Sequence, residues 1–279
     1  MNHKINLRIP RASNLVDLKL LLINSQEKQK ISELLSIEKF KKENYLEEYL
    51  KLLRLLGFIQ EDKYLFLLTN KGKDIKFKIS KTSELTEDDK KILKEEFSQL
   101  DIVKIFLKNV FYFDVHKNNF PNEECLTKED IKGRYLKYRE LNDAVAERES
   151  RIIYNWLLGL ELIEPLQILD NKNKGFNVCY HIIGKDLDFD EFSKKIKSTI
   201  FNALKDNRQK SEWVEIPKVG NLFCIQNNIS KKQFKKFFIE YVIKNPLNLQ
   251  LSTGSLLRKE VEIEGIEMNN KLYFYVKLT

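Results

Sequence analysis

The chain has 279 residues, of which 42% are hydrophobic and 32% charged, so it can form two or three domains with real cores and is not expected to be disordered. Its formal net charge of +8 favours an acidic partner, nucleic acid before a membrane surface. No apolar run approaches the length of a membrane span, and the first residues, MNHKINLRIP, lack the apolar stretch of a signal peptide. We therefore expect a cytoplasmic protein with no membrane partner.

The three cysteines, Cys125, Cys179 and Cys224, are widely spaced along the chain. Their odd number and the absence of a C-x-x-C motif argue against a disulfide framework and against a zinc site. We expect all three to be buried, reduced thiols.

The first 85 residues follow the order of a winged helix, in which a strand pair closes one side of a three-helix core. Apolar residues at helical spacing and a glycine at Gly57, where a left-handed C-cap belongs, support this reading. Helices are predicted over residues 14–24, 28–37 and 43–57, two short strands within 58–69, and a further helix over 70–79.

The same order then recurs, with a period of roughly a hundred residues. Thr86 is the expected N-cap of a connecting helix, and Thr127 the expected cap of a later one. The second copy comprises a connector over residues 86–100, helices over 101–113, 126–136 and 141–159, and a hairpin with a polar tip over 170–175.

A third copy follows a second connecting helix. In its main helix, Ser230 is the expected cap and the buried stripe contains Phe234, Phe237, Phe238, Tyr241 and Val242. Its predicted elements are a connector over 189–206, a strand leading into a helix over 212–228, a helix over 229–245, a strand over 247–252 and a hairpin over 262–278. The predicted fold class is thus mainly α with small β-hairpins, as three tandem winged-helix units over residues 1–85, 86–188 and 189–279.

The predicted helix over residues 141–159 carries the most specific surface pattern. Ala144, Arg148, Arg151 and Asn155 share one ridge at spacing i, i+4, i+7 and i+11. Arg can pair with guanine and Asn with adenine in the major groove of DNA, while a small Ala permits close approach. The alternative is an ordinary ion pair between Arg151 and Glu147, one turn earlier.

Other cations are expected to hold phosphates, since phosphate contacts fix the register of a protein on DNA. In the first copy, by contrast, the lysines of the helix over 43–57 alternate with glutamates and are expected to form ordinary i,i+4 pairs. The predicted contacts are Lys132, Arg134, Lys137 and Arg139 before the ridge helix, Lys172 and Lys174 at the second wing tip, Lys231, Lys232, Lys235 and Lys236 in the third copy, and Arg258 and Lys259 in its long loop. The minor groove is an alternative to phosphate for the wing tip and the long loop, and a solvated face is the alternative for the lysines of the third copy.

Catalytic chemistry finds little support in the sequence. His3, His116 and His181 are isolated, and the phosphate-binding motif G-x-x-x-x-G-K is absent. A metal-dependent nuclease would need an acid before a strand ending in Glu-x-Lys, and the nearest string, 262–271, falls on the last predicted hairpin. We therefore expect no catalytic residue, metal or cofactor, and no enzymatic activity.

Two stretches carry a resemblance to known proteins. "YLKLLRLLGFIQEDKYLFLLTNKGKDI" and "IIYNWLLGLELIEP" resemble the helix, Leu-Gly step, strand and T-x-x-G pattern of tandem winged-helix DNA-binding proteins, in particular the DNA-recognition region of type IIS restriction endonucleases such as FokI. The stretch from 214 to the end is similar to a C-terminal winged helix of restriction or defence proteins. The catalytic half of such endonucleases has no counterpart here, so the resemblance implies a chain that reads DNA while another subunit acts on it.

The function expected from these patterns is sequence-specific binding of double-stranded DNA, as the recognition component of a restriction or antiviral defence system with a catalytic protein partner. Three alternatives stay open. One is a transcriptional or replication regulator, which symmetric dimers and palindromic sites would favour. Another is a winged-helix protein–protein scaffold of an SMC-type complex. The last is an enzyme with an unrecognised site, which a nuclease assay with Mg²⁺ or Mn²⁺ would reveal.

Overall fold

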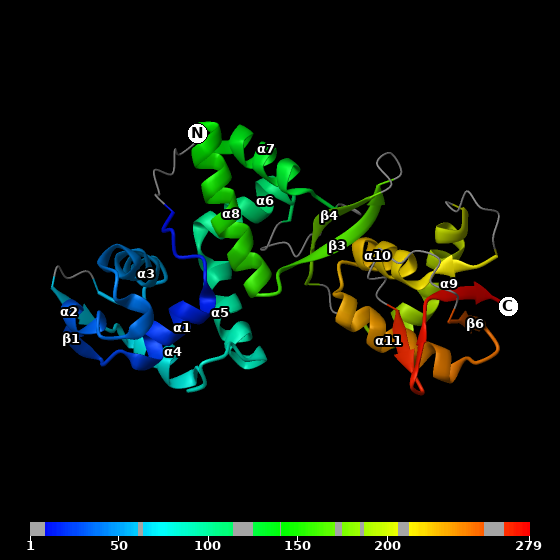
Figure 1. The fold of residues 1–279 in the computed structure, drawn as a ribbon, viewed down its shortest axis with the longest axis horizontal. Coiled ribbons are helices and arrows are strands. Elements are labelled where there is room, and N and C mark those ends of the chain that lie inside the picture. Colours follow the sequence, from blue (N-terminus) through cyan, green and yellow to red (C-terminus); the bar gives the residue numbers. More distant parts are fainter. Residues whose placement is uncertain are drawn as a thin grey trace. The chain divides into compact units, whose positions relative to one another are not determined.

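The computed structural model describes residues 9–60, 64–113, 125–139, 141–170, 175–184, 187–205, 212–253 and 265–279. By their contacts these residues form two compact units, one from residues 1–120 and 128–163 and the other from 121–127 and 164–279. Each unit is described separately below (Figure 1). The three predicted winged-helix units and their boundaries stay predictions.

The N-terminal part of the first unit combines short helices with one small sheet. Strand β1 pairs antiparallel with β2, with Lys28 opposite Leu67, and an isolated bridge joins Ile59 to Leu68. The elements are α1 (Leu15–Asn24), β1 (Lys28–Lys30), α2 (Ile31–Leu34), the 3₁₀ helix η1 (Glu38–Phe40), α3 (Glu43–Leu55), β2 (Leu65–Leu67) and α4 (Asn70–Lys78).

The predicted helix over residues 28–37 is wrong. Residues 28–30 form a strand, and only Ile31–Leu34 is α-helical. Lys28, Gln29 and Lys30 are good helix formers in isolation, but pairing with β2 satisfies their backbone groups instead, and such tertiary pairing overrides local propensity.

The predicted T-x-x-G pattern forms the joint between α3 and α4. Thr69 accepts a hydrogen bond at Oγ1 from the N–H of Gly72 and donates one to the carbonyl of Gly57, which has the positive φ of +72° expected of a left-handed cap. Gly72 lies so close to α3's exit that a Cβ there would be 2.0 Å from the carbonyl oxygen of Phe58. These contacts fix where the chain turns back.

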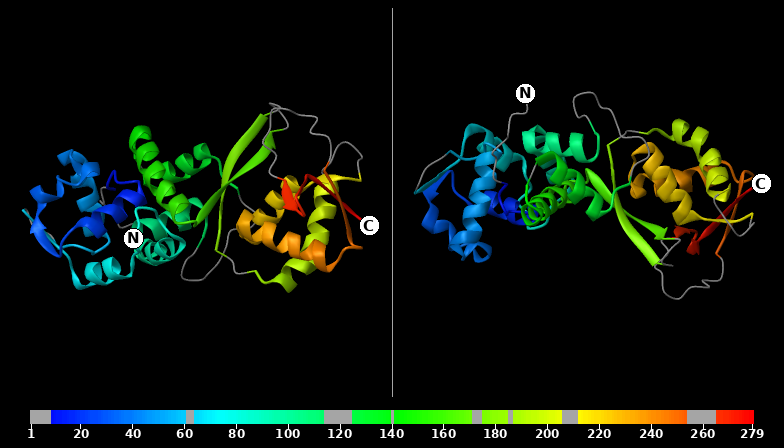
Figure 2. Two further views of the ribbon diagram at one scale, coloured as in Figure 1. Left: turned by 60° about the horizontal axis from the view of Figure 1, so that its bottom comes forward. Right: turned by 90° about the horizontal axis from the view of Figure 1, so that it is seen from above.

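The rest of the first unit is helical, with α5 (Glu87–Gln99), α6 (Asp101–Val110), α7 (Lys128–Arg139) and α8 (Asp143–Gly159). Thr86 caps α5 through a complete capping box with Asp89. Helices α6, α7 and α8 pack in sequence order, as Figures 1 and 2 show. Trp156 of α8 is fully buried and donates its indole N–H to the carbonyl of Ala12 at 2.7 Å, which ties α8 to the chain before α1.

The second unit begins with a strand-like segment and a hairpin. Leu126 forms a two-way backbone bridge with Tyr180 of β4 (Gly175–Ile182), and β4 pairs with β3 (Ile163–Asp170). A disulfide joins Cys125 to Cys179, so the prediction of three reduced thiols is wrong for these two, while Cys224 is a buried free thiol. The error arose because the bridge between 126 and 180 brings together cysteines that are 54 residues apart, which no local spacing reveals.

The remainder of the second unit surrounds an aromatic core. Phe192, Phe223, Phe234 and Phe238 are buried in it, and Phe234 lies directly against Gly220. Its elements are α9 (Phe189–Lys205), β5 (Val214–Glu215), α10 (Ile216–Asn227), α11 (Lys231–Lys244), β6 (Leu249–Ser252), β7 (Ile266–Met268), β8 (Lys271–Tyr273) and β9 (Tyr275–Leu278).

The predicted last hairpin is present but shorter than expected. Strands β7 and β8 pair around Asn269 and Asn270, both with positive φ, as a tight primed turn requires. The chain then continues as β9, which lies between β5 and β6 in a separate antiparallel sheet. The C-terminal strand therefore closes the core of this unit. Within the described residues, no helix is long and apolar enough to span a bilayer.

Candidate nucleic-acid interface

Helix α8 is positioned by its cap and by its buried face. Asn142 accepts a hydrogen bond at Oδ1 from the N–H of Val145, which starts the helix just after α7 ends. The buried face contains Ala146, Ile153, Trp156 and Leu157 and packs into the first unit. The opposite side of α8 is therefore left toward solvent.

The predicted ridge lies at the edge of that solvent-facing side. Ala144 and Arg151 are exposed, whereas Arg148 and Asn155 are half-buried. The alternative interpretation, a pair between Arg151 and Glu147, is wrong, because no ion pair joins these two described residues. The guanidinium of Arg151 is thus available to a partner.

A buried carboxylate, which the sequence analysis missed, lies behind the ridge. Glu149 is 4% exposed and accepts a hydrogen bond at Oε2 from the phenol of Tyr135 at 2.9 Å. Arg139 lies 3.6 Å from the same oxygen, and Arg148 lies 3.9 Å from Oε1. The two arginines balance the buried charge, so both have a structural role. A glutamate one turn before the buried Ile153 was the signal that could have revealed it.

The other cations predicted to bind phosphates before α8 differ in whether their side chains already contact other groups of the protein. Lys132 pairs with Asp143 at 2.6 Å. Arg134 donates to the carbonyl of Val110 at 2.9 Å and lies over the ring of Tyr112, so it holds the end of α6. Lys137 is exposed at the end of α7. Of this group, Lys137 is the one whose described surroundings leave it ready to meet a phosphate.

The lysines of α11 follow a doubly capped helix start. Ser230 accepts from the N–H of Gln233, as predicted, and the carboxylate of Glu164 accepts from the N–H of Lys231 at 2.8 Å. This carboxylate offsets the unfavourable effect of cations at a helix N-terminus. Lys232 and Lys236 are exposed, while Lys231 and Lys235 are half-buried. The predicted contacts Lys172, Lys174, Arg258 and Lys259 lie outside the described residues.

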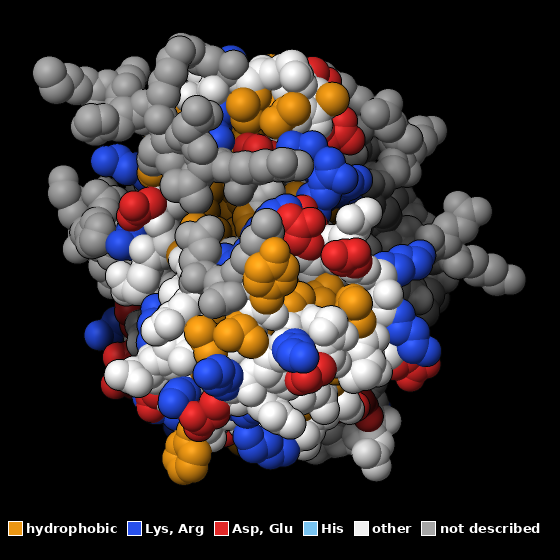
Figure 3. Space-filling model, turned by 90° about the vertical axis from the view of Figure 1, so that its left-hand side faces the viewer, with side chains coloured by type: hydrophobic (Ala, Val, Ile, Leu, Met, Phe, Trp, Pro, Cys, Tyr) orange, Lys and Arg blue, Asp and Glu red, His pale blue; other side chains and the backbone are white. Residues whose placement is uncertain are grey.

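The surface of the first unit around α3 has balanced charge. Lys51 pairs with Glu47 at 2.9 Å and Glu48 at 3.0 Å, as predicted. Positive and negative side chains are interspersed on the face shown in Figure 3. An open pocket of about 800 Å³ here is lined by Arg11, Lys42, Glu43, Asn44, Tyr45, Glu47, Glu48, Tyr49 and Lys51. Three cations face three carboxylates, so this surface offers little attraction to a polyanion.

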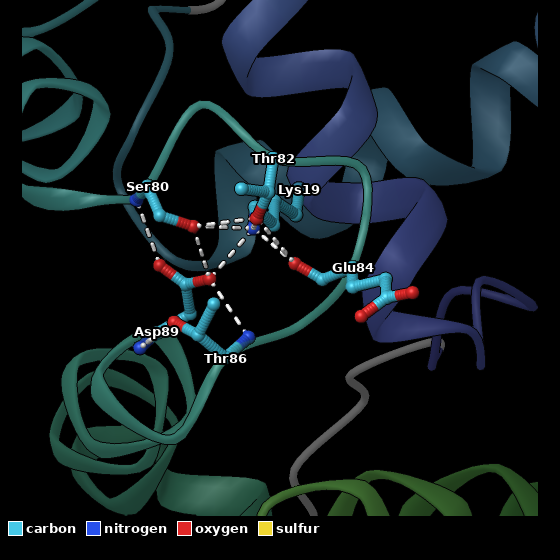
Figure 4. A network of polar contacts seen from close by, with 6 residues as sticks. All are labelled: Lys19, Ser80, Thr82, Glu84, Thr86 and Asp89. Carbon is cyan, nitrogen blue, oxygen red and sulfur yellow. Dashed lines mark hydrogen bonds and ion pairs between the residues drawn. The ribbon is translucent and has the colours of Figure 1, made fainter.

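One lysine that contributes to the net charge is removed from the surface altogether. Lys19 of α1 is fully buried and pairs with Asp89 of α5 at 2.6 Å. Its ammonium also donates to Ser80, Thr82 and the carbonyl of Glu84, as Figure 4 shows. The network satisfies all the donors of a buried cation and fixes the loop between α4 and α5.

Among the described residues, no cluster of three or more His, Cys, Asp and Glu could hold a metal ion. His181 is fully buried, with Nε2 3.6 Å from Glu164 Oε2, in keeping with a structural position. Burial raises the pKa of the Cys224 thiol well above its usual value, so this thiol stays protonated and unreactive. His3 and His116 lie outside the described residues.

No protein-family model matches the chain, and no curated protein matches it. Among solved structures it is similar to the restriction endonuclease FokI, at TM-score 0.34 and 15% identity over 87% of this chain and 48% of that one. The structure of FokI bound to DNA gives a TM-score of 0.35 and 14% identity over 89% of this chain and 48% of that one. The chain thus spans about half the length of these proteins. Similarity at this level defines no family.

Proposed function

We propose that the chain binds double-stranded DNA and that α7 and α8 act as a helix-turn-helix with α8 in the major groove. The observation that carries this proposal is the exposed guanidinium of Arg151, on a ridge with exposed Ala144 and the partly exposed Arg148 and Asn155. A ridge of this width and chemistry fits the edges of base pairs, where Arg reads guanine and Asn reads adenine.

Phosphate contacts are assigned to exposed cations on both units. Lys137 follows α7 directly before the reading helix, and Lys232 and Lys236 lie on the first two turns of α11. Such contacts supply most of the affinity for DNA without reading its sequence. Arg134 and Arg139, which hold other parts of the first unit, contribute to binding through structure.

The proposed architecture is three winged-helix units. Its support is the order of the described elements, in which helices precede a small antiparallel pair three times: β2 with the 59–68 bridge, β3 with β4, and β7 with β8. We assign the chain to the recognition part of a restriction or defence system, with the catalytic activity on a partner subunit. The support for this assignment is the proposed DNA-reading surface of α8.

One observation favours a protein partner for the same helix. The first turns of α8 carry Asp143 and Glu147, whose side chains are 69% and 61% exposed and would repel phosphates. A winged-helix scaffold, which binds protein through this helix, is therefore the second candidate.

Selection of bound oligonucleotides from a random duplex pool at about 0.15 M salt separates the two candidates, since salt sets the strength of phosphate attraction. An enriched motif supports sequence-specific reading. Binding without an enriched motif shows that the chain contacts phosphates but does not read sequence. If no duplex binds, the DNA proposal is refuted and the protein–protein scaffold is the remaining candidate. A parallel selection with Arg151→Ala should lose enrichment at one base pair if α8 reads the motif.

A further inference from the structure

The outer face of α9 is a second candidate surface for a polyanion, distinct from α8 and α11. From the sequence, α9 was predicted only as a helix that connects two winged-helix units. Its buried side carries Phe192, Ile196, Ile200 and Ala203, which belong to the core of the second unit. The side turned away from this core holds the exposed residues Lys194, Lys197, Ser198, Phe201, Asn202 and Lys205.

This exposed face carries lysines and, after the first turn of the helix, no acid. The carboxylates of α9 lie in its first turn, with Asp190 one turn before Lys194, and the 14 residues from 192 to 205 contain four lysines and no acid. At about 100° per residue, Lys194, Phe201 and Lys205 fall within about 40° of one another, over a length of about 16 Å. The helix therefore presents a stripe with Lys194 and Lys197 toward one end, Lys205 at the other and Phe201 between them.

Folding does not account for these lysines. Lys195, on the flank, pairs with Glu191 at 2.5 Å and donates to Asn227 at 3.0 Å. By contrast, Lys194, Lys197 and Lys205 form no ion pair with any described carboxylate.

An aromatic ring interrupts the stripe in the manner expected of a nucleic-acid surface. Phe201 is 50% exposed, and the ammonium of Lys205 lies 4.5 Å from the centre of its ring. Surfaces that bind single-stranded nucleic acid combine a positively charged groove with aromatic rings on which bases stack. Three exposed lysines without a carboxylate partner on one helix face favour a strongly acidic partner over a protein of ordinary composition.

We propose that this face of α9 binds the sugar-phosphate backbone of DNA, with its lysines on phosphates and Phe201 against a sugar or an unstacked base. The proposal rests on the proposed function for the identity of the partner. It adds a sequence-independent contact on the second unit. Because the face reads no base edges, it should bind duplexes of any sequence alike.

The test is the triple variant Lys194→Gln, Lys197→Gln, Lys205→Gln. Its affinity for a random-sequence duplex is measured by fluorescence anisotropy between about 0.05 and 0.3 M salt, a roughly sixfold range. A matched control with the same loss of charge replaces Lys51, Lys73 and Lys78, each held in an ion pair on the first unit, by Gln. The slope of log affinity against log salt should fall by about 2 to 3 in the α9 variant, at about 0.9 per phosphate, and stay unchanged in the control.

Phe201→Leu separates the two roles of the ring. If the variant weakens binding to single-stranded DNA but not to the duplex, the ring stacks on a base. If it weakens binding to both, the ring contacts a sugar. Either result supports the proposal. Binding of both substrates at the wild-type level excludes Phe201 from the surface.

The outcomes also separate this inference from the proposed function. If the α9 variant matches its control while Arg151→Ala loses motif enrichment, the α9 face is refuted and the reading helix stands. If the α9 variant weakens binding while Arg151→Ala has no effect on any sequence, the reading helix fails and the α9 face stands. A chain that binds no DNA refutes both.

Discussion

Tyr135 of α7 donates a hydrogen bond from its phenol oxygen to Glu149 Oε2 of α8 at 2.9 Å, and both side chains are buried. Burial, followed by the negative charge of Glu149, raises the pKa of Tyr135, so the phenol remains a donor at any ordinary pH. This contact sets the rotation of α8 against α7 and holds the carboxylate that faces Arg148. The orientation of the proposed reading helix therefore depends on a pair that lies inside the first unit.

Replacing Tyr135 by Phe should lower the free energy of unfolding by about 1.5–3 kcal/mol, because a buried carboxylate loses a hydrogen-bond donor. Tyr138→Phe, four-tenths exposed on the same helix, is the matched control and should change stability by less than about 0.5 kcal/mol. Urea denaturation of the three proteins measures the difference. Equal midpoints for the two variants would show that the contact contributes nothing.

The free energy of unfolding should depend on pH through Asp89. Burial would raise its pKa, but hydrogen bonds from Lys19, from the N–H groups of Ser80 and Thr86 and from the Ser80 hydroxyl lower it below the usual range. A lowered folded-state pKa gives stability that is present above the unfolded value of about 3.9 and is lost as pH falls toward the folded value.

Asp89→Asn should therefore cost about 3–5 kcal/mol at pH 7, since it leaves Lys19 as a buried charge without its counterion. The difference in free energy of unfolding between variant and wild type should become smaller as the pH falls below about 4. Asp88→Asn, an exposed neighbour in the same helical turn, is the control and should cost about 1 kcal/mol or less. Urea midpoints between pH 7 and pH 2 give both results. A difference that is constant with pH contradicts the ion pair.

The disulfide between Cys125 and Cys179 closes a loop that contains α7 and α8. Loop-closure entropy predicts that removing it, as Cys125→Ser with Cys179→Ser, lowers the free energy of unfolding by about 4 kcal/mol. Reductant should destabilise the wild type and have no effect on the double variant. Thiol titration in denaturant, without reductant, should find one free thiol, Cys224. A count of three would show that the bridge does not form.

Alanine at Gly72 and at Gly133 should have effects of opposite sign. A Cβ at Gly72 would lie 2.0 Å from a backbone oxygen, so Gly72→Ala should destabilise the protein by about 3 kcal/mol. Gly133, inside α7, has nothing within 4 Å of its would-be Cβ, so Gly133→Ala should stabilise by about 0.5–1 kcal/mol. Thermal unfolding of both variants tests the pair. A loss at Gly133 would mean that α7 is not helical there.

Arg151 and Lys236 should affect DNA binding differently. On a selected duplex, Arg151→Ala should cost about 1–3 kcal/mol and relax specificity at one position. Lys236→Ala should weaken selected and random duplexes alike and reduce the salt slope by about one. Titrations of both variants on both duplexes measure this. If each variant affects selected and random DNA equally, the division between reading and phosphate contact is refuted.

Local signals in the sequence predicted local structure well. Thr86, Ser230 and Gly57 cap the helices to which they were assigned, because caps depend on neighbours within a few residues. The exposure of Arg151 also follows from helical spacing alone.

Features that need distant residues could not be predicted in this way. Strand β1 exists because β2 pairs with it from 35 or more residues away, and the disulfide exists because residue 126 pairs with 180. Likewise, the spacing of Glu149 from Ile153 indicates a buried position, but no spacing rule indicated that Arg139 and Arg148 would balance its charge. The sequence thus indicated the candidate surface on α8. It did not indicate that the buried Glu149 would hold two of the predicted DNA-binding arginines, Arg139 and Arg148.

The interleaving of the two units along the chain has a practical consequence. Residues 121–127 belong with 164–279, while 128–163 belong with the N-terminal residues. No single cut therefore yields two intact halves: a fragment ending at 120 lacks α7 and α8, and one starting at 164 lacks the partner of Tyr180 and Cys179. During synthesis the ribosome must pass residue 163 before the first unit can be completed, so truncated products should expose apolar surface and be rapidly degraded.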